Sequence, residues 1–387
     1  MRNGIINLID RERLVQIVSD CISCPSEVPT GSDECMSQYV YGFLNDLGLK
    51  PWKQDCGDGR FNVLARIPGI EKQEIMYCGH LDVVPAGTDG WDSPPYEPQI
   101  RKGRLYGRGS ADMKGSIGCM LYLAELAAKG KIVPLENLLL FFDIDEENHN
   151  LGVRTFLTDP IVSDFIIVGE PTSLELAMGH RGVMAFRVEI VGKSAHAAQP
   201  DYGINPIRAA ALLQKKVDGY QTILDGRNVK YQGRSSMEIT MIQAGRKVNM
   251  IPETCQVMID RRLTDGEDDV SVQRELNRLL KEVEQESGCG CRMDVTTYCP
   301  PGLCSEAHER IGRIKECVKS VTGKEAVLKA FDASGEAGLL TQYLGTPAIT
   351  FGPGDIKQAH TVNEYISIED LVQGTAIYGM LMFTPKS

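Results

Sequence analysis

The sequence predicts an α/β protein with a mostly parallel central sheet that is interrupted by a smaller α+β domain. Three short apolar runs, at residues 62–67, 74–78 and 138–143, have the length and composition of buried strands. The apolar segment at residues 115–128 lies between the last two runs and is typical of a buried helix. Strands that alternate with helices in this way indicate a largely parallel sheet covered by helices.

The other elements follow from hydrophobic periodicity. Two amphipathic helices, at residues 11–21 and 34–49, are expected before the sheet. After Gly179 the order is that of a ferredoxin-like unit: strand 183–192, helix 205–220, strands 236–245 and 254–263, helix 269–287 and strand 291–298. The α/β pattern then returns with helix 306–322, strand 346–351 and helix 368–382. We therefore expect a main domain formed by residues 1–180 and 299–387, and an inserted domain formed by residues 181–298.

Composition excludes several classes of function. The 387 residues are 42% hydrophobic and 24% charged, as in a soluble globular protein, and the net charge of −11 argues against a nucleic-acid or anionic-membrane surface. The apolar run near the N-terminus is too short for a signal peptide, and no run is long enough to span a membrane. The twelve cysteines are scattered, so we expect reduced thiols and a cytoplasmic protein.

Metal-type ligands stand where apolar runs end. A single Asp or Glu at such a place is ordinarily a turn residue or a helix cap, but here five such exits supply imidazoles and carboxylates, the ligands of zinc and related divalent ions. The exits carry His80 with Asp82, Asp112, Glu146 with Glu147, Glu170, and His360. Residues i and i+2 of a strand share a face, so His80 and Asp82 are expected to act together.

Six motifs, in this order and spacing, resemble the signatures of a co-catalytic zinc hydrolase family: GHLDVVP, GRGSADMKG, DEEN, GEPT, KSAHAAQP and GPGDIKQAHTVNEY. The family includes acetylornithine deacetylase, succinyl-diaminopimelate desuccinylase, aminoacylases, carboxypeptidase G2-type enzymes and some di- and tripeptidases. The resemblance extends from about residue 10 to residue 385. It implies a zinc-exopeptidase-like catalytic domain that carries a lid and dimerisation domain.

The resemblance implies a site for two divalent metal ions, with zinc expected first and cobalt or manganese as alternatives. Asp112 would bridge the two ions. His80 and Glu170 would complete the protein ligands of one ion, and Glu147 and His360 those of the other. The peptide bond that follows the bridging residue, between Asp112 and Met113, is expected to be cis.

The same resemblance assigns the catalytic groups. Glu146 would be the general base, and Asp82 would accept a hydrogen bond from His80 and so fix its tautomer. His196 would reach the active site of the other subunit of a homodimer and hydrogen-bond the oxyanion. His149 stands where family members usually have Gly, and is either an exposed loop residue or an extra group near the metals.

Three further residues, Arg181, Asn249 and Arg262, match positions that hold the carboxylate of the substrate. Arginine suits this task because its planar guanidinium pairs with a carboxylate through two parallel hydrogen bonds. The predicted function is a metal-dependent amidohydrolase that removes an N-acyl group from an amino acid. A di- or tripeptidase or a carboxypeptidase of the same family is the enzymatic alternative. A non-catalytic relative that binds metal and acylated ligands is the alternative of another class.

Overall fold

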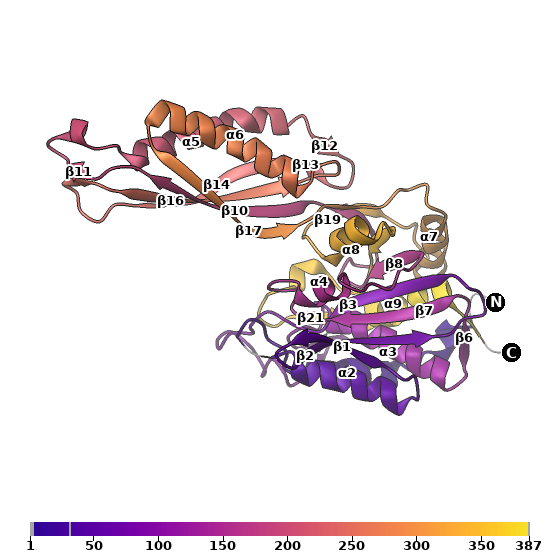
Figure 1. Ribbon diagram of the computed structural model, residues 1–387. Helices are drawn as coiled ribbons and strands as arrows, with labels where there is room; N and C mark the ends of the chain where they lie inside the picture. Colours follow the sequence, from indigo (N-terminus) through magenta and orange to yellow (C-terminus); the bar gives the residue numbers. More distant parts are fainter. Residues whose placement is uncertain (1–3, 31, 386–387) are drawn as a thin grey trace. The chain divides into compact units, whose positions relative to one another are not determined.

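The computed structural model describes residues 4–30 and 32–385, and the chain forms two compact units (Figure 1). Unit 1 consists of Met1–Met178, Cys304–Lys329 and Leu339–Ser387. Unit 2 consists of Gly179–Leu303 and Ala330–Gly338. The boundaries after Met178 and after Leu303 lie two and five residues from those predicted after residues 180 and 298. The short segment Ala330–Gly338 was expected in the main domain, and the structure places it in unit 2 instead.

Unit 1 is built on a mixed sheet whose order is β1-β2-β7-β3-β8-β20-β9. Its strands are β1 (Trp52–Gly57), β2 (Arg60–Ile67), β3 (Glu74–His80), β7 (Asn137–Asp143), β8 (Phe165–Val168), β9 (Leu176–His180) and β20 (Ala348–Thr350). The four central strands β7, β3, β8 and β20 run parallel, whereas the pairs toward both edges are antiparallel. Strand β3 is buried along its whole length, as expected for a parallel strand covered on both faces.

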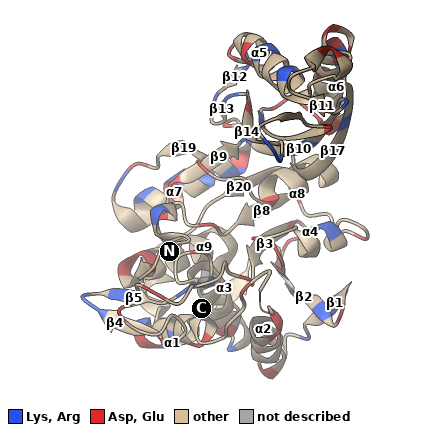
Figure 2. Cartoon of the chain, turned by 90° about the vertical axis from the view of Figure 1, so that its left-hand side faces the viewer, with Lys and Arg blue, Asp and Glu red and all other residues tan. Residues whose placement is uncertain are grey.

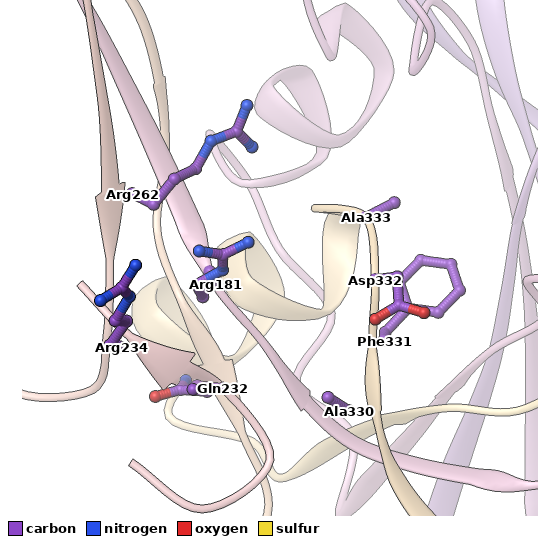
Figure 3. Close-up of a pocket in the computed structure, with 9 residues that line it drawn as sticks. Arg181, Gln232, Arg234, Arg262, Ala330, Phe331, Asp332 and Ala333 are labelled. Carbon is purple, nitrogen blue, oxygen red and sulfur yellow. The ribbon is translucent and has the colours of Figure 1, made fainter. Parts of the chain in front are cut away.

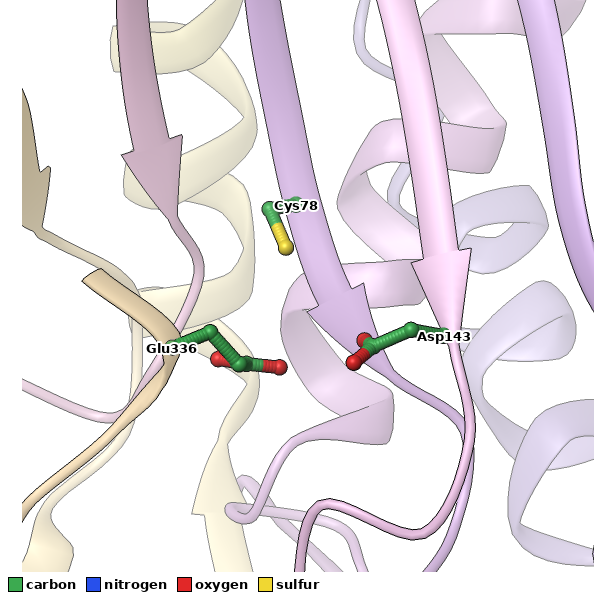
Figure 4. A group of neighbouring side chains, drawn as sticks. All are labelled: Cys78, Asp143 and Glu336. Carbon is green, nitrogen blue, oxygen red and sulfur yellow. The ribbon is translucent and has the colours of Figure 1, made fainter. Parts of the chain in front are cut away.

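The register of the parallel strands brings their carboxyl ends to one edge of the sheet. His80 at the end of β3 lies opposite Asp143 at the end of β7, and Cys78 lies opposite Phe141 and Val168. Because the side-chain period of a strand is two, Cys78, His80 and Asp143 point to the same face, and Figure 4 shows the first and last of these side chains. The loops that leave this edge carry the candidate site.

The helices of unit 1 are α1 (Arg11–Ile22), α2 (Glu34–Asp46), α3 (Lys114–Ala128), α4 (Leu151–Phe156), α7 (Glu309–Thr322), α8 (Glu336–Leu344, which begins in unit 2) and α9 (Ile368–Met382). Helix α3 packs on α1 and α9, and α9 packs on α7. Helix α3 is almost entirely buried, which explains its apolar sequence. A Cβ atom at Gly118 would lie 2.4 Å from the Cγ2 atom of Val18, so glycine permits the close contact between α3 and α1.

Smaller elements complete unit 1. A three-stranded sheet is formed by β21 (Tyr365–Ser367), β5 (Arg104–Tyr106) and β4 (Gln99–Arg101), and a two-stranded one by β6 (Ile132–Pro134) and β22 (Phe383–Pro385). Strand β19 (Leu328–Phe331) pairs with β9, and the 3-10 turns are Ile6–Leu8 and Ile356–Gln358. Hydrophobic periodicity could not reveal these strands because they are only three or four residues long.

Unit 2 is a ferredoxin-like α+β domain with additions. Its antiparallel sheet has the order β14-β16-β10-β17, and α5 and α6 pack on each other. The main elements are β10 (Gly182–Val191), α5 (Pro206–Leu224), β14 (Ser236–Ala244), β16 (Thr254–Leu263), α6 (Asp269–Ser287) and β17 (Gly290–Cys299). The additions are β11 (Ala195–His196), β12 (Asn228–Val229), β13 (Gly233–Arg234), β15 (Met250–Ile251), β18 (Gly302–Leu303) and the 3-10 turn Pro200–Tyr202.

Helix α6 shows how the sequence sets a boundary in unit 2. Asp268 accepts a hydrogen bond from the backbone of Ser271, the Ser271 hydroxyl accepts one in return, and Gly288 ends the helix with a φ of 71°. Helices α5 and α6 carry both signs of charge (Figure 2), and Lys216 of α5 pairs with Glu282 and Glu286 of α6. The predicted fold class is confirmed. No helix among the described residues is long and apolar enough to cross a membrane.

Candidate active site

The first half of the candidate site is a buried group formed by His80, Asp112 and Glu170. One ligand atom from each lies within 4.8 Å of the other two. The Nε2 atom of His80 is 3.1 Å from Oδ1 of Asp112 and 3.4 Å from Oε1 of Glu170. His80 ends β3 and Glu170 follows the parallel neighbour β8, so the sheet itself brings them together.

The second half shares Asp112 with the first and adds Glu147 and His360. The Nε2 atom of His360 is 3.0 Å from Oε1 of Glu147 and 3.4 Å from Oδ2 of Asp112. The two oxygens of Asp112 therefore face different imidazoles, as a bridging carboxylate requires. The bond between Asp112 and Met113 is cis, as the resemblance implies. All five ligands expected from the sequence lie together within unit 1.

Asp82 connects these ligands to the loop after β7. The Nδ1 atom of His80 is 3.0 Å from the backbone carbonyl of Asp82 and 3.8 Å from its carboxylate, so the carbonyl is the group that accepts from the imidazole. The carboxylate instead accepts hydrogen bonds from the backbone N–H groups of Glu146 and Glu147, at 3.1 and 3.0 Å. Asp82 therefore orients one metal-type ligand and also fixes the loop that carries another.

Glu146 lies at the edge of the cluster. One of its carboxylate oxygens is within 4.8 Å of a carboxylate oxygen of Glu170. The turn before it has Asp145 at a φ of 65°, and the carboxylate of Asp145 accepts from Arg60 at 3.0 Å and from the N–H of His149 at 3.2 Å. The side chain of His149 is exposed, which corresponds to the loop-residue alternative.

Glu364 and Arg108, which support the turn that carries Asp112, were missed in the sequence. Glu364 is fully buried, and its carboxylate accepts hydrogen bonds from the N–H groups of Gly109, Ala111 and Asp112 at 2.8 to 3.1 Å. It also forms a 2.7 Å ion pair with Arg108, which is likewise buried. Glu364 thus holds the turn that presents Asp112. An acidic residue four positions after His360 resembles any loop residue in the sequence, so only its proximity to a ligand could have drawn attention to it.

The electrostatics of the cluster fit a cation. Burial opposes protonation of His80, but its hydrogen bonds with Asp112 and Glu170 still raise the pKa of His80 well above its usual value. Hydrogen bonds to Asp112 and Glu147 raise the pKa of His360 to about 10. Burial opposes ionisation of Asp112, yet the two imidazoles hold its pKa below the ordinary range. The carboxylates of the cluster are therefore stabilised by positive charge between them, which protons on the imidazoles or divalent ions can supply.

The other predicted residues lie in unit 2, where His196 and Asn249 form one group and the two arginines form another. His196 lies on β11 next to β15, and the N–H of Ala197 donates to the carbonyl of Asn249 at 3.0 Å. The side chains of His196 and Asn249 are exposed. Strand β11 and the hairpin β12–β13 lie at opposite ends of this unit (Figure 1). Asn249 is therefore not brought together with the two predicted arginines.

Arg181 and Arg262 line one cavity of about 270 Å³ within unit 2 (Figure 3). Arg181 follows β9, and Arg262 lies on β16, where its guanidinium pairs with Asp260 at 2.8 Å. Its neighbour Arg261 faces the other way and is fully buried in an ion pair with Glu267. The two arginines that we predicted to bind the substrate carboxylate therefore share a cavity.

Comparison with known proteins agrees with this geometry. The sequence pattern of "Peptidase family M20/M25/M40" matches residues 76–384. Succinyl-diaminopimelate desuccinylase of Wolbachia pipientis is 29% identical, over 94% of this chain and 91% of the relative. Acetylornithine deacetylase of Proteus mirabilis is 26% identical, over 95% and 94%.

Solved structures show the same fold. Aminopeptidase PepT of Bacillus cereus superimposes with a TM-score of 0.81 at 18% identity, over 97% of this chain and 98% of the other. A dinuclear metal binding peptidase of Bacillus subtilis gives 0.70 at 15% identity, over 96% and 97%. With the family pattern matched over most of its length and an imidazole and carboxylate cluster at the edge of its sheet, this chain belongs to peptidase family M20/M25/M40 and is a metallo-hydrolase that acts on amide or peptide bonds.

Proposed function

We propose that the protein removes an N-acyl group from an amino acid and holds two divalent ions, zinc by preference, at the cluster around Asp112. The relatives named for deacetylation and desuccinylation support this reaction class. The observation that carries the proposal is the cavity shared by Arg181 and Arg262. Two guanidinium groups at one cavity suit a substrate with a free carboxylate beside the scissile amide, as an N-acyl amino acid has.

The residues around the cluster divide the chemistry among them. His80, Asp112, Glu147, Glu170 and His360 would hold the ions, whose chemical contribution is to lower the pKa of a bound water toward neutrality. Glu146 would take the proton of the attacking water and then deliver it to the amine, which must be protonated to leave. The carboxylate of Asp82 accepts hydrogen bonds from the backbone N–H groups of Glu146 and Glu147 and so fixes the loop from which Glu147 would bind metal and Glu146 would act as the base.

A carboxypeptidase, which also acts next to a free carboxylate, is the alternative that uses the same cavity. The two activities differ only in the group on the far side of the amide, so a substrate panel separates them. Acetyl-, succinyl- and aminoacyl-amino acids would be assayed with zinc, cobalt and manganese, and faster hydrolysis of the acetyl or succinyl compounds is expected. Preference for the aminoacyl compounds would make the protein a peptidase.

The variant Glu146→Ala tests the alternative that this protein binds metal and acylated ligands without catalysing their hydrolysis. Loss of a general base lowers the rate by about 10²- to 10⁴-fold, and the metal content should stay unchanged. The matched control is Glu97→Ala, at an exposed residue whose backbone hydrogen-bonds Pro94 and Gln99. Equal rates for Glu146→Ala and the wild type would remove Glu146 from the mechanism. Absence of hydrolysis in the wild type with every substrate of the panel would favour the binding protein.

We further propose that unit 2 forms a homodimer. Strand β14 is an edge of its sheet, and its second half is exposed, with Met241 at 52% and Ile242 at 49%. An exposed apolar edge strand is a ready surface for pairing with a second copy. Pairing of this kind would allow His196 of one copy to serve the active site of the other. Light scattering at micromolar concentration should give the mass of a dimer, and a monomer would contradict the proposal.

A further inference from the structure

A third arginine lines the cavity that contains Arg181 and Arg262. Arg234 ends the short hairpin β12–β13, and its guanidinium lies on the same side of the cavity as the other two (Figure 3). The opposite wall is formed by the segment Ala330–Ala333, on which Asp332 is the charged residue. One carboxylate accepts two parallel hydrogen bonds from one guanidinium, so three guanidinium groups exceed what a single carboxylate needs.

The position of Arg234 is fixed by two buried residues close to it in the chain, Gln232 and Ser235. Gln232 is 4% exposed, and its Nε2 donates to the carbonyls of Gly302 and His180 at 2.9 and 3.2 Å. Its Oε1 accepts from the N–H of Asp265 at 2.7 Å. Ser235 is fully buried and hydrogen-bonds Thr264 at 2.9 Å and also Glu267. Arg234 therefore projects from a hairpin that is anchored two residues before it, at Gln232, and directly after it, at Ser235.

The arginines of the cavity keep donors available. Arg234 pairs with Asp225 at 2.9 Å through one nitrogen, and both side chains are largely exposed, so this pair contributes little and can be exchanged. Arg262 uses two of its nitrogens on Asp260. Within residues 4–30 and 32–385, the structure gives Arg181 no ion pair. Since each guanidinium has five N–H donors, the wall can receive two separate anionic groups.

We propose that Arg234 is a specificity-determining residue that binds a second carboxylate of the substrate. The site would then favour N-acyl amino acids with an acidic side chain, namely N-acyl glutamate or aspartate. This inference rests on the proposed function only in that Arg181 and Arg262 receive the α-carboxylate. Asp332 on the opposite wall would repel an acidic side chain and so direct it toward Arg234. A basic side chain that pairs with Asp332 is the competing outcome.

The test measures binding, so that it does not depend on turnover. Titration calorimetry of the metal-loaded Glu146→Ala protein would compare N-acetylglutamate, N-acetylglutamine and Nα-acetyl-lysine at low ionic strength. Glutamine has nearly the shape of glutamate without its charge, and hydrogen bonds to charged groups lead us to expect at least about tenfold tighter binding of N-acetylglutamate. Equal binding of these two compounds, or tighter binding of Nα-acetyl-lysine, would overturn the proposal.

Variants test whether Arg234 causes the preference for N-acetylglutamate over N-acetylglutamine. Arg234→Gln should reduce the preference for glutamate over glutamine to less than about threefold, and Arg234→Lys should retain part of it because the charge remains. The matched control is Arg208→Gln on the exposed face of α5, which removes the same charge outside the cavity and should keep the full preference. An unchanged preference in Arg234→Gln, with circular dichroism showing a folded protein, would exclude Arg234.

The outcomes also separate this inference from the proposed function. A protein that prefers N-acetylglutamate through Arg234 but hydrolyses none of the acyl-amino acids would support the inference and contradict the proposed function. A protein that hydrolyses them without preference for an acidic side chain would support the proposed function and contradict the inference.

Discussion

Glu364→Gln should destabilise the protein strongly although it changes few atoms. The carboxylate of Glu364 accepts three backbone N–H groups and the guanidinium of Arg108, and an amide would place an NH₂ group against some of these donors. Removing one partner of a buried ion pair costs about 3–5 kcal/mol. Arg108 also donates to the carbonyls of Thr361 and Pro85, which partly compensates its charge, so we expect about 3 kcal/mol.

Urea denaturation of the metal-free protein measures this loss of unfolding free energy directly. The matched control is Glu369→Gln, since Glu369 pairs with Arg11 at 3.1 Å but both side chains are 54% exposed, and such a pair contributes about 0–1 kcal/mol. The Glu364 variant should also bind metal about 10- to 100-fold more weakly, because its turn presents Asp112. Losses in the two variants within about 1 kcal/mol of each other would refute the argument from burial.

Three other predictions concern pH, metal and the exposed histidine. Burial lowers the pKa of His180, which donates to the carbonyl of Arg181 and accepts from the N–H of Gly338. Below about pH 6.5 the unfolded chain binds a proton at His180 that the folded protein resists, so this residue contributes a loss of stability as the pH falls. His180→Gln should remove that contribution in urea denaturation at pH 5 to 8. A pH dependence equal to that of the wild type would contradict it. Removal of metal with EDTA should abolish hydrolysis and lower the melting temperature, because a ligand at 100 times its Kd adds about 2.7 kcal/mol to the free energy of unfolding. An unchanged melting temperature would argue against a bound metal. His196→Ala should lower kcat by about 10²-fold with unchanged metal content, whereas a normal kcat would make His196 structural.

Most of the fold could be predicted because its signals are local. Helix α6 is recognised by its amphipathic periodicity, and helices α3 and α9 are recognised by their long, mostly apolar sequences. The ligands His80 and Glu170 could be found because they stand at the ends of apolar strands. Asp112 and His360 follow glycine-rich turns instead, and the resemblance of the motifs was needed to give them roles.

The rest of the site depends on tertiary contacts that the sequence does not encode locally. Glu364 is acidic and lies in a loop, so nothing in the sequence distinguishes it from an exposed residue. Asp82 was expected to accept from His80, and it does so through its carbonyl while its carboxylate binds two N–H groups of another loop. Arg234 lines the same cavity as Arg181 and Arg262 through the tertiary hydrogen bonds that anchor its hairpin, which the sequence does not reveal.

The pairing of β8 with β20 has a consequence for biosynthesis. Strand β8 ends at Val168, but its parallel neighbour β20 begins at Ala348, roughly 180 residues later, which takes about 10–40 s of translation at 5–20 residues per second. Throughout that interval the nascent sheet has an uncovered edge, and His360 has not yet been made. Unit 2, by contrast, has nearly all of its chain by Leu303 and can fold on the ribosome first. The metal-binding centre can be completed only after His360 has been made, so metal loading is expected to follow the folding of unit 2.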